Sequence, residues 1–184
     1  GGSKAEEEAL PSQALLLVHT PFMETKIPSG GATNETEAQL AVTLALILLW
    51  NFPGIKVIMI ITPYTAQLQV LRRVLQRMKG QGFDPREKDC EIRLMTIDDS
   101  QGTTENFSIV SLVRSGGTGI GFIRDMKRMN VSLTRQRVGL IVLGAEQTMR
   151  KFPGGRNLQA LLEPSGRVLR FSALDDLKTV GGGK

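Results

Sequence analysis

The chain is poor in side chains that bind metals or form disulfides. Its 184 residues include one cysteine, Cys90, and one histidine, His19. A single cysteine excludes an internal disulfide and a cysteine-rich zinc site, and a lone histidine has no second imidazole with which to share a metal. We therefore expect an intracellular protein, nuclear or cytoplasmic, with no metal site. Cys90 is interpreted as a small residue at a strand edge and His19 as a satisfied core or edge histidine.

Long apolar runs and strong charge are also missing. The apolar stretch at residues 40–50 is too short for a membrane helix, and no basic-then-apolar leader opens the chain, so we expect no membrane partner. The net charge of +5, from 23 basic and 18 acidic residues, permits a polyanionic partner without requiring one. With 41% hydrophobic residues the chain has enough apolar side chains for one sizeable core.

The phosphate-binding loop G-x-x-x-x-G-K-[ST] does not occur anywhere in the sequence. The one Gly-Lys pair, Gly183-Lys184, lies in the final residues. Without that loop a nucleoside triphosphate and its magnesium ion have no cradle. The chain is therefore not expected to be a complete ATPase.

Apolar runs alternate with helical stripes along the chain, a pattern typical of a parallel sheet covered on both faces. Strands are predicted at 14–19, 55–61, 91–97, 108–113 and 140–143, and an edge strand at 165–171. Helices are predicted at 35–49, 66–79, 124–134, 146–151 and 156–163. This order predicts a doubly wound α/β sheet. We expect one domain at residues 10–175, between a tag or linker at 1–9 and a flexible tail at 176–184.

Polar residues follow two of the predicted strands directly. Thr62, Pro63 and Tyr64 follow the central strand, and the segment 98–102 follows the next. Ligands of such sheets bind at the carboxyl ends of the strands. The two segments are therefore predicted to converge on one edge of the sheet.

The segment 121–144, GFIRDMKRMNVSLTRQRVGLIVLG, carries cations at nearly helical spacing before an apolar strand. A solvated amphipathic helix would also be basic on one side. Here, however, short polar side chains alternate with apolar ones where core packing would not require them, which favours a functional helix. The cations are Arg124, Lys127, Arg128 and Arg135, and the short polar residues are Asn130, Ser132 and Thr134.

This segment, with ITPYTAQ at 61–67 and MTIDDSQG at 95–102, resembles the second RecA-like domain of superfamily 1 helicases of the kind found in nonsense-mediated decay. Three late motifs of that family occur here in order and with similar spacing. The resemblance spans residues 15–144, and three ordered motifs are far more specific than any one alone.

The resemblance assigns nucleotide chemistry to four residues. Arg135 matches the arginine finger, which stabilises the charge that builds on the γ-phosphate during hydrolysis; the alternative is a cation at a helix C-terminus. Arg128 would support nucleotide or inter-domain contacts. Gln101, followed by Gly102 in the nucleotide-binding motif, would link the nucleotide and nucleic-acid sites, or else cap a turn.

Nucleic-acid contact is implied for the ends of the strands. Thr62 and Thr96 would contact phosphates without reading bases, and Pro63 and Tyr64 would shape the loop. Tyr64 is the only tyrosine. It either stacks on a base or closes over the start of the next helix.

Two positions depart from the family pattern. Thr104 stands where the family has the glutamate of Q-G-R-E, and Glu105 follows one position later, where an extended chain points a side chain the other way. Glu35 stands where the family has an arginine that reaches the γ-phosphate. In an alternative role, Glu35 is a first-turn helix residue favoured by the helix dipole, with Asn34 as the N-cap.

Two hypotheses follow. In the first, the chain is the C-terminal RecA-like half of an ATP-dependent RNA or DNA helicase, and it supplies Arg135 to ATP and Mg²⁺ held by the first RecA-like domain of the same parent protein. It would bind single-stranded RNA or DNA and be inactive alone. In the second, it is a degenerate helicase domain that serves as a nucleic-acid or protein binding module in an RNA-processing or silencing assembly. The retained Arg135 and Gln101 favour the first, whereas Thr104 and Glu35 fit the second.

Overall fold

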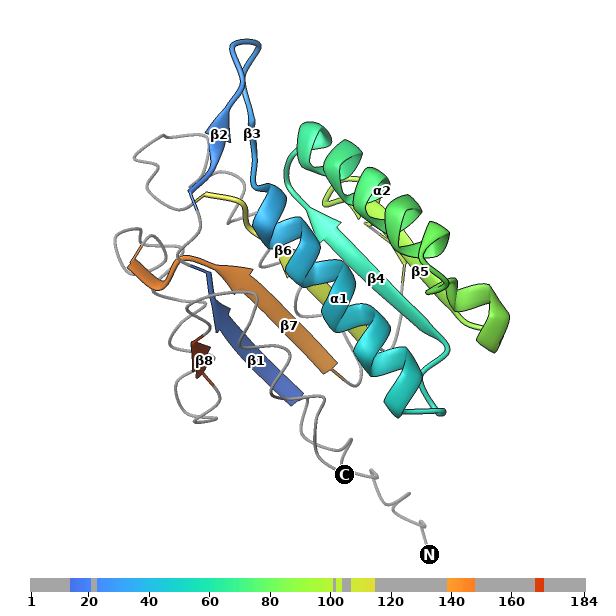
Figure 1. Ribbon diagram of the computed structural model, residues 1–184. Helices are drawn as coiled ribbons and strands as arrows, with labels where there is room; N and C mark the ends of the chain where they lie inside the picture. The colour runs from blue at the N-terminus through green and yellow to red at the C-terminus, as the bar shows by residue number, and fades with distance from the viewer. Residues whose placement is uncertain are drawn as a thin grey trace, which may run out of the picture.

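A computed structural model describes residues 14–20, 23–100, 102–103, 107–114, 139–147 and 168–170. These residues form a six-stranded sheet, a two-stranded hairpin, two long helices and one short 3₁₀ helix (Figure 1). The predicted helices at 124–134 and 156–163, and the predicted tag and tail, lie outside the described residues. The domain limits at 10 and 175 stay predictions.

The large sheet has the order β5-β4-β6-β7-β1-β8, and every neighbouring pair is parallel. Its strands are β1 (Ala14–His19), β4 (Val57–Thr62), β5 (Glu91–Thr96), β6 (Phe107–Ser111), β7 (Gly139–Gly144) and β8 (Val168–Arg170). The chain runs from β1 through β4 to β5 in one direction and then returns to β6 and β7. Such a reversal defines the doubly wound class, and here it lies between β4 and β6; ligands of this class bind outside the carboxyl ends of the strands at the reversal. The predicted fold is therefore confirmed.

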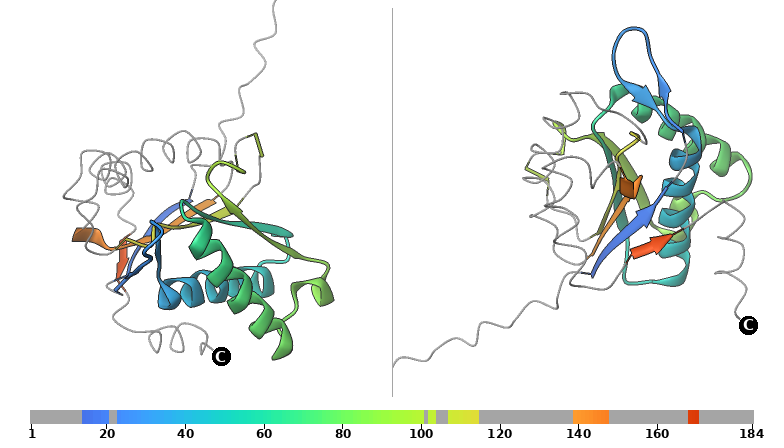
Figure 2. Two further views of the ribbon diagram at one scale, coloured as in Figure 1. Left: turned by 90° about the horizontal axis from the view of Figure 1, so that it is seen from above. Right: turned by 90° about the vertical axis from the view of Figure 1, so that its left-hand side faces the viewer.

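Two helices connect the first half of the sheet. Helix α1 (Glu35–Asn51) precedes β4, and α2 (Thr65–Gly80) joins β4 to β5. Both cover the same face of the sheet, as Figure 2 shows, and they pack against each other. A 3₁₀ helix, η1 (Pro85–Lys88), follows α2, and the antiparallel hairpin of β2 (Thr25–Lys26) and β3 (Ala32–Thr33) precedes α1.

The core follows from the alternation of side chains along the central strands. Ile58 and Ile60 of β4 pack with the apolar faces of α1 and α2, while Met59 and Ile61 point to the opposite face. All four side chains are at most 2% exposed. Both faces of the central strands are thus shielded from water, as the near-continuous apolar sequences predict.

Helix α1 begins at the predicted position. The Asn34 side chain caps it by accepting a hydrogen bond from the Glu37 amide at 3.0 Å, and Glu35 and Glu37 lie in the first turn, where the helix dipole favours acidic residues. The predicted N-cap and first-turn roles of Asn34 and Glu35 are confirmed. The helix ends two residues later than predicted, at Asn51.

Candidate functional site at the carboxyl edge of the sheet

The two motif segments that follow β4 and β5 lie side by side. Thr62 of β4 pairs with Thr96 of β5 in the parallel register, and the Ile97 amide donates a hydrogen bond to the Thr62 carbonyl at 3.1 Å. The predicted convergence on one edge is therefore confirmed. This edge adjoins the reversal of strand order between β4 and β6, which is where ligands of doubly wound sheets bind.

The first motif segment turns inward at this edge. Thr62 is fully buried, and its Oγ1 accepts a 3.4 Å hydrogen bond from the Tyr64 amide. Pro63 is half-buried. Tyr64 is the N-cap residue of α2 and forms a small apolar cluster with Ala32 and Val113. In this conformation the Thr62 hydroxyl stabilises the turn that leads into α2.

Arg114, which follows β6, covers the ring of Tyr64. Its guanidinium carbon lies 5.2 Å from the centre of the ring, and its Nε donates a 3.1 Å hydrogen bond to the Tyr64 hydroxyl. Tyr64 is 9% exposed. Of the two alternatives for Tyr64, this geometry favours closure over the start of α2, because a base has little exposed ring to stack on.

The second motif segment forms a turn after β5. Thr96 is half-buried; its hydroxyl donates to Asp99 Oδ2 at 2.7 Å and accepts from the Asp99 amide at 3.3 Å. Ser100 is buried and donates to the Ile97 carbonyl at 2.7 Å. Gly102 has φ 87°, a left-handed conformation that favours glycine. The glycine of this motif therefore serves the turn geometry.

A buried carboxylate joins the ends of two strands to a helix behind this edge. Glu37, in the first turn of α1, is 1% exposed and accepts hydrogen bonds from Thr20 Oγ1 and Ser111 Oγ, both at 2.7 Å, and from the Val113 amide at 2.8 Å. Thr20 follows β1 and is itself bonded to β7 through the Gly144 carbonyl. The carboxylate thus links the ends of β1 and β6 to the start of α1.

Gln67 in α2 extends this network through the backbone of Asn34. Its Oε1 accepts from the Asn34 amide at 2.8 Å, and its Nε2 donates to the Asn34 carbonyl at 3.0 Å and to Ser111 Oγ at 3.3 Å. The Asn34 side chain donates to the Val113 carbonyl at 3.3 Å. The starts of α1 and α2 and the loop after β6 are consequently held as one unit. We call Asn34, Glu37, Gln67, Ser111 and Val113 the edge network.

Burial raises the pKa of the Glu37 carboxyl above its ordinary value of 4.5. Hydrogen bonds from Ser111, Thr20 and Val113 act in the opposite direction because they stabilise the charged form, and the charge of Glu24 adds to the upward shift. Each oxygen of the carboxylate already has a donor. Glu37 is therefore occupied in holding the fold, not in binding a metal ion.

Several predicted site residues lie outside the described residues. These are Gln101, Arg128, Arg135, Thr104 and Glu105, whose roles stay predictions. Glu35 is described: its carboxylate lies 3.8 Å from Arg73 Nη2 and 4.0 Å from Arg77 Nη2 of α2. It therefore contributes to the exposed contact between the two helices, where such ion pairs are worth at most about 1 kcal/mol.

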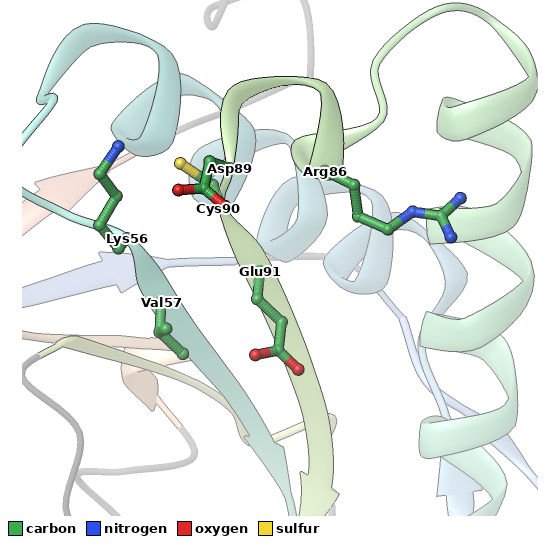
Figure 3. Close-up of a pocket in the computed structure, with 6 residues that line it drawn as sticks. All are labelled: Lys56, Val57, Arg86, Asp89, Cys90 and Glu91. Carbon is green, nitrogen blue, oxygen red and sulfur yellow. The ribbon is translucent and has the colours of Figure 1, made fainter.

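The opposite, amino edge of the sheet carries a cavity of about 240 Å³. Figure 3 shows its lining, in which the Arg86 side chain points away from that of Lys56; the lining residues are Lys56, Val57, Arg86, Asp89, Cys90 and Glu91. Arg86 is bound to Asp84 at 2.6 Å, and the Cys90 thiol lies 3.2 Å from the Lys88 carbonyl. Two of its charged residues, Arg86 and Glu91, are engaged in ion pairs with Asp84 and Arg93, so it is a weaker candidate site than the carboxyl edge.

Other features of the described residues are structural. His19 Nδ1 accepts a 2.9 Å hydrogen bond from the Glu146 amide, which confirms a satisfied histidine at a strand end. Within the described ranges no cluster of three or more potential metal ligands occurs. In the same part of the chain, neither long helix is apolar and extended enough to span a bilayer.

Sequence reasoning assigned no role to Glu37, Gln67, Ser111 or Arg114. Gln67 is the last residue of the quoted motif segment 61–67, and Glu37 follows Glu35 by two residues; each is surrounded in its helix by residues that face the core. A polar residue at a core-facing helical position was the available signal, because such a residue requires a hydrogen-bonding partner.

Comparisons with known proteins agree with the motif analysis. Residues 3–147 match the model of a family described as an AAA domain. Aligned segments are 36% identical over 121 residues to Helicase sen1 and 31% identical over 139 residues to ATP-dependent helicase upf1, both of Schizosaccharomyces pombe. A third is 32% identical over 130 residues to the human DNA replication ATP-dependent helicase/nuclease DNA2. These alignments cover 64%, 74% and 70% of the chain but 7%, 15% and 11% of the relatives.

Proposed function

The chain belongs to the AAA-domain family, within the superfamily 1 helicases, and from this membership we propose that it is the C-terminal RecA-like half of an ATP-dependent helicase. Its working environment is intracellular, nuclear or cytoplasmic, as for a protein that acts on nucleic acid. The observation that carries the proposal is the register of Thr62 with Thr96, which brings two helicase motifs to one edge beside the reversal of strand order.

In this proposal the nucleotide site is shared between two domains. The described edge offers polar groups and strand ends but no phosphate-binding loop, so ATP and Mg²⁺ fit only if another domain holds them. That domain is the first RecA-like domain of the same parent protein. This chain contributes Arg135 as the arginine finger, with Gln101, Gly102 and Arg128 near the nucleotide, and has no activity alone.

Nucleic-acid contacts come from the same edge. Thr96, half-buried at the end of β5, has the exposure needed to approach a phosphate. Thr62 and Tyr64 are buried, so they support the contact through backbone groups and loop shape, together with Pro63. Such contacts bind phosphates of single-stranded RNA or DNA without reading sequence.

A second candidate function is that of a binding module in which hydrolysis has been lost. Glu35 favours it, because this carboxylate pairs with Arg73 and Arg77 where the family has a phosphate-binding arginine. Under this alternative the fold and the nucleic-acid contacts are retained without turnover in the parent protein.

Two measurements on the isolated chain test the proposal. ATP turnover by the pure chain should not exceed that of a buffer blank; turnover well above the blank would contradict the shared site. Fluorescence anisotropy with a labelled single strand should show weak, sequence-independent binding with a shallow salt dependence, because few phosphates are contacted. Strong base preference, or no binding at low salt, would contradict the nucleic-acid contacts.

A further inference from the structure

We propose that Arg114 is a phosphate-binding residue of this edge and that Glu37 positions it by holding the turn at Val113. The inference rests on the proposed function, because it adds a cation to the same site. Its ligand chemistry is a phosphoryl group, from either the nucleic-acid backbone or the nucleotide.

The location of Arg114 is the first support. It stands three residues after the end of β6, on the carboxyl side of the sheet where the strand order reverses between β4 and β6, and its side chain is 20% exposed. Its contacts are the Tyr64 ring and hydroxyl and a 4.0 Å approach of Nη1 to Glu24 Oε1. Among the described residues, Nη2 has no hydrogen-bonding partner. A guanidinium has five N–H donors in a planar fork that matches phosphate, so part of that fork is available.

The backbone that aims Arg114 is the second support. Val113 has φ 71°, a left-handed conformation that is costly for a β-branched residue. Its amide is held by Glu37 at 2.8 Å and its carbonyl by Asn34 at 3.3 Å. An unfavourable conformation persists only where its surroundings impose it, and here the edge network does so. The turn directs the next residue, Arg114, onto the ring of Tyr64.

The manner of holding Arg114 is the third support. The Tyr64 ring and hydroxyl fix the plane of the guanidinium, while the contact to Glu24 is at the limit of an ion pair. A phosphate that approaches this edge therefore meets an oriented cation whose carboxylate contact is long. Exchange of Glu24 for a phosphate oxygen requires no change at Tyr64.

The first test compares two charge-neutralising variants at opposite edges of the sheet. Arg114→Gln should weaken binding of a labelled single strand, or of MgATP measured separately, by about tenfold, the value of a hydrogen bond to a charged group. For the strand, the slope of log affinity against log salt should fall by about 0.7, the contribution of one phosphate. The matched control is Arg86→Gln, which removes the same charge from the amino edge. The ligand whose affinity falls identifies the source of the phosphoryl group.

The outcomes separate the inference from the proposed function. If the single strand binds and Arg114→Gln has no larger effect than Arg86→Gln on strand or MgATP, the inference is wrong and the helicase assignment is unaffected. If no strand binds, the nucleic-acid part of the proposed function fails. The inference is then decided by titrating the ¹⁵N-labelled chain with inorganic pyrophosphate. A shift of the Arg114 Nε–H signal, identified by its loss in Arg114→Gln, supports it, and no shift up to the solubility limit overturns it.

The positioning role of Glu37 is tested by variants that keep or remove the acceptor for the Val113 amide. Glu37→Gln retains an oxygen there and should keep phosphate affinity within twofold, whereas Glu37→Met removes it and should lose affinity as Arg114→Gln does. Leu71→Ala, in the core away from this turn, controls for lost stability. Equal affinity of Glu37→Met and Leu71→Ala under folded conditions would refute positioning. If Glu37→Met does not fold, a loss of affinity in Glu37→Gln equal to that of Arg114→Gln would refute it.

Discussion

Removal of the Gln67 side chain should destabilise the chain far more than its size suggests. Gln67 is fully buried and satisfies both backbone groups of Asn34, at 2.8 and 3.0 Å, besides its contact to Ser111. In Gln67→Ala the Asn34 amide loses its partner inside the protein, whereas the Asn34 carbonyl keeps the hydrogen bond that it accepts from the Ala38 amide at 3.0 Å. An unsatisfied buried polar group costs about 1–3 kcal/mol, so we expect a loss of about 2 kcal/mol in the free energy of unfolding.

The same helix supplies a matched control. Gln69 lies two residues away and is exposed, so Gln69→Ala should change the free energy of unfolding by no more than about 0.5 kcal/mol. Urea denaturation followed by the fluorescence of Trp50, the single tryptophan, measures both variants. In a thermal scan the Gln67 variant should melt about 4–8 °C lower, at about 2–4 °C per kcal/mol for a chain of this size. A loss below about 1 kcal/mol, with an unchanged denaturant slope, would refute the reasoning about the edge network.

Three further predictions concern catalysis, pH and packing. In the parent protein Arg135→Ala should lower kcat about a thousandfold with less effect on nucleotide affinity, and Thr104→Glu should raise turnover. Steady-state ATPase assays measure both variants. If the parent is already inactive and neither variant differs from it, the binding module is favoured. Because the folded-state pKa of Glu37 is raised, its contribution to stability is largest below 4.5 and is lost as pH rises through the folded-state value. The stability of Glu37→Gln relative to wild type should therefore increase with pH in urea titrations above pH 4.5, and a constant difference would contradict this. Gly139→Ala would place a methyl group against the ring of Phe107 and should lower the free energy of unfolding by about 1–3 kcal/mol. Gly80→Ala, which has open space around it, should leave the free energy of unfolding almost unchanged. Equal melting temperatures of the two variants would refute the packing argument.

The strands of the large sheet and the two long helices were predictable because local sequence determines them strongly. The β-branched apolar residues of β4 specify a buried strand, and the structure places it at Val57–Thr62 against a prediction of 55–61. Asn34 specified the start of α1 because its side chain caps the first turn. Convergence of the motifs followed from a parallel sheet, in which carboxyl ends share one edge.

The hydrogen-bonding partners at the site were not predictable in the same way. Periodicity shows that Glu37 faces the core, but it does not show that a hydroxyl from Ser111 will meet it. Tyr64 left two alternatives open because a sequence does not say which cation will cover its ring, and Arg114 is 50 residues away. Contacts between distant segments depend on the register of whole strands, which no local pattern contains.

The long reach of the edge network affects the order of events in folding. Glu37 bonds to Ser111 and Val113 across 74 and 76 residues, and Asn34 bonds to Val113 across 79. Closing loops of this length requires chain entropy to be lost before the contacts form. While the chain is being synthesised, α1 is complete long before β6 exists, and burial of Glu37 without those donors is costly. Firm docking of α1 therefore awaits β6, so the carboxyl edge acquires its final shape only after most of this sheet has been made.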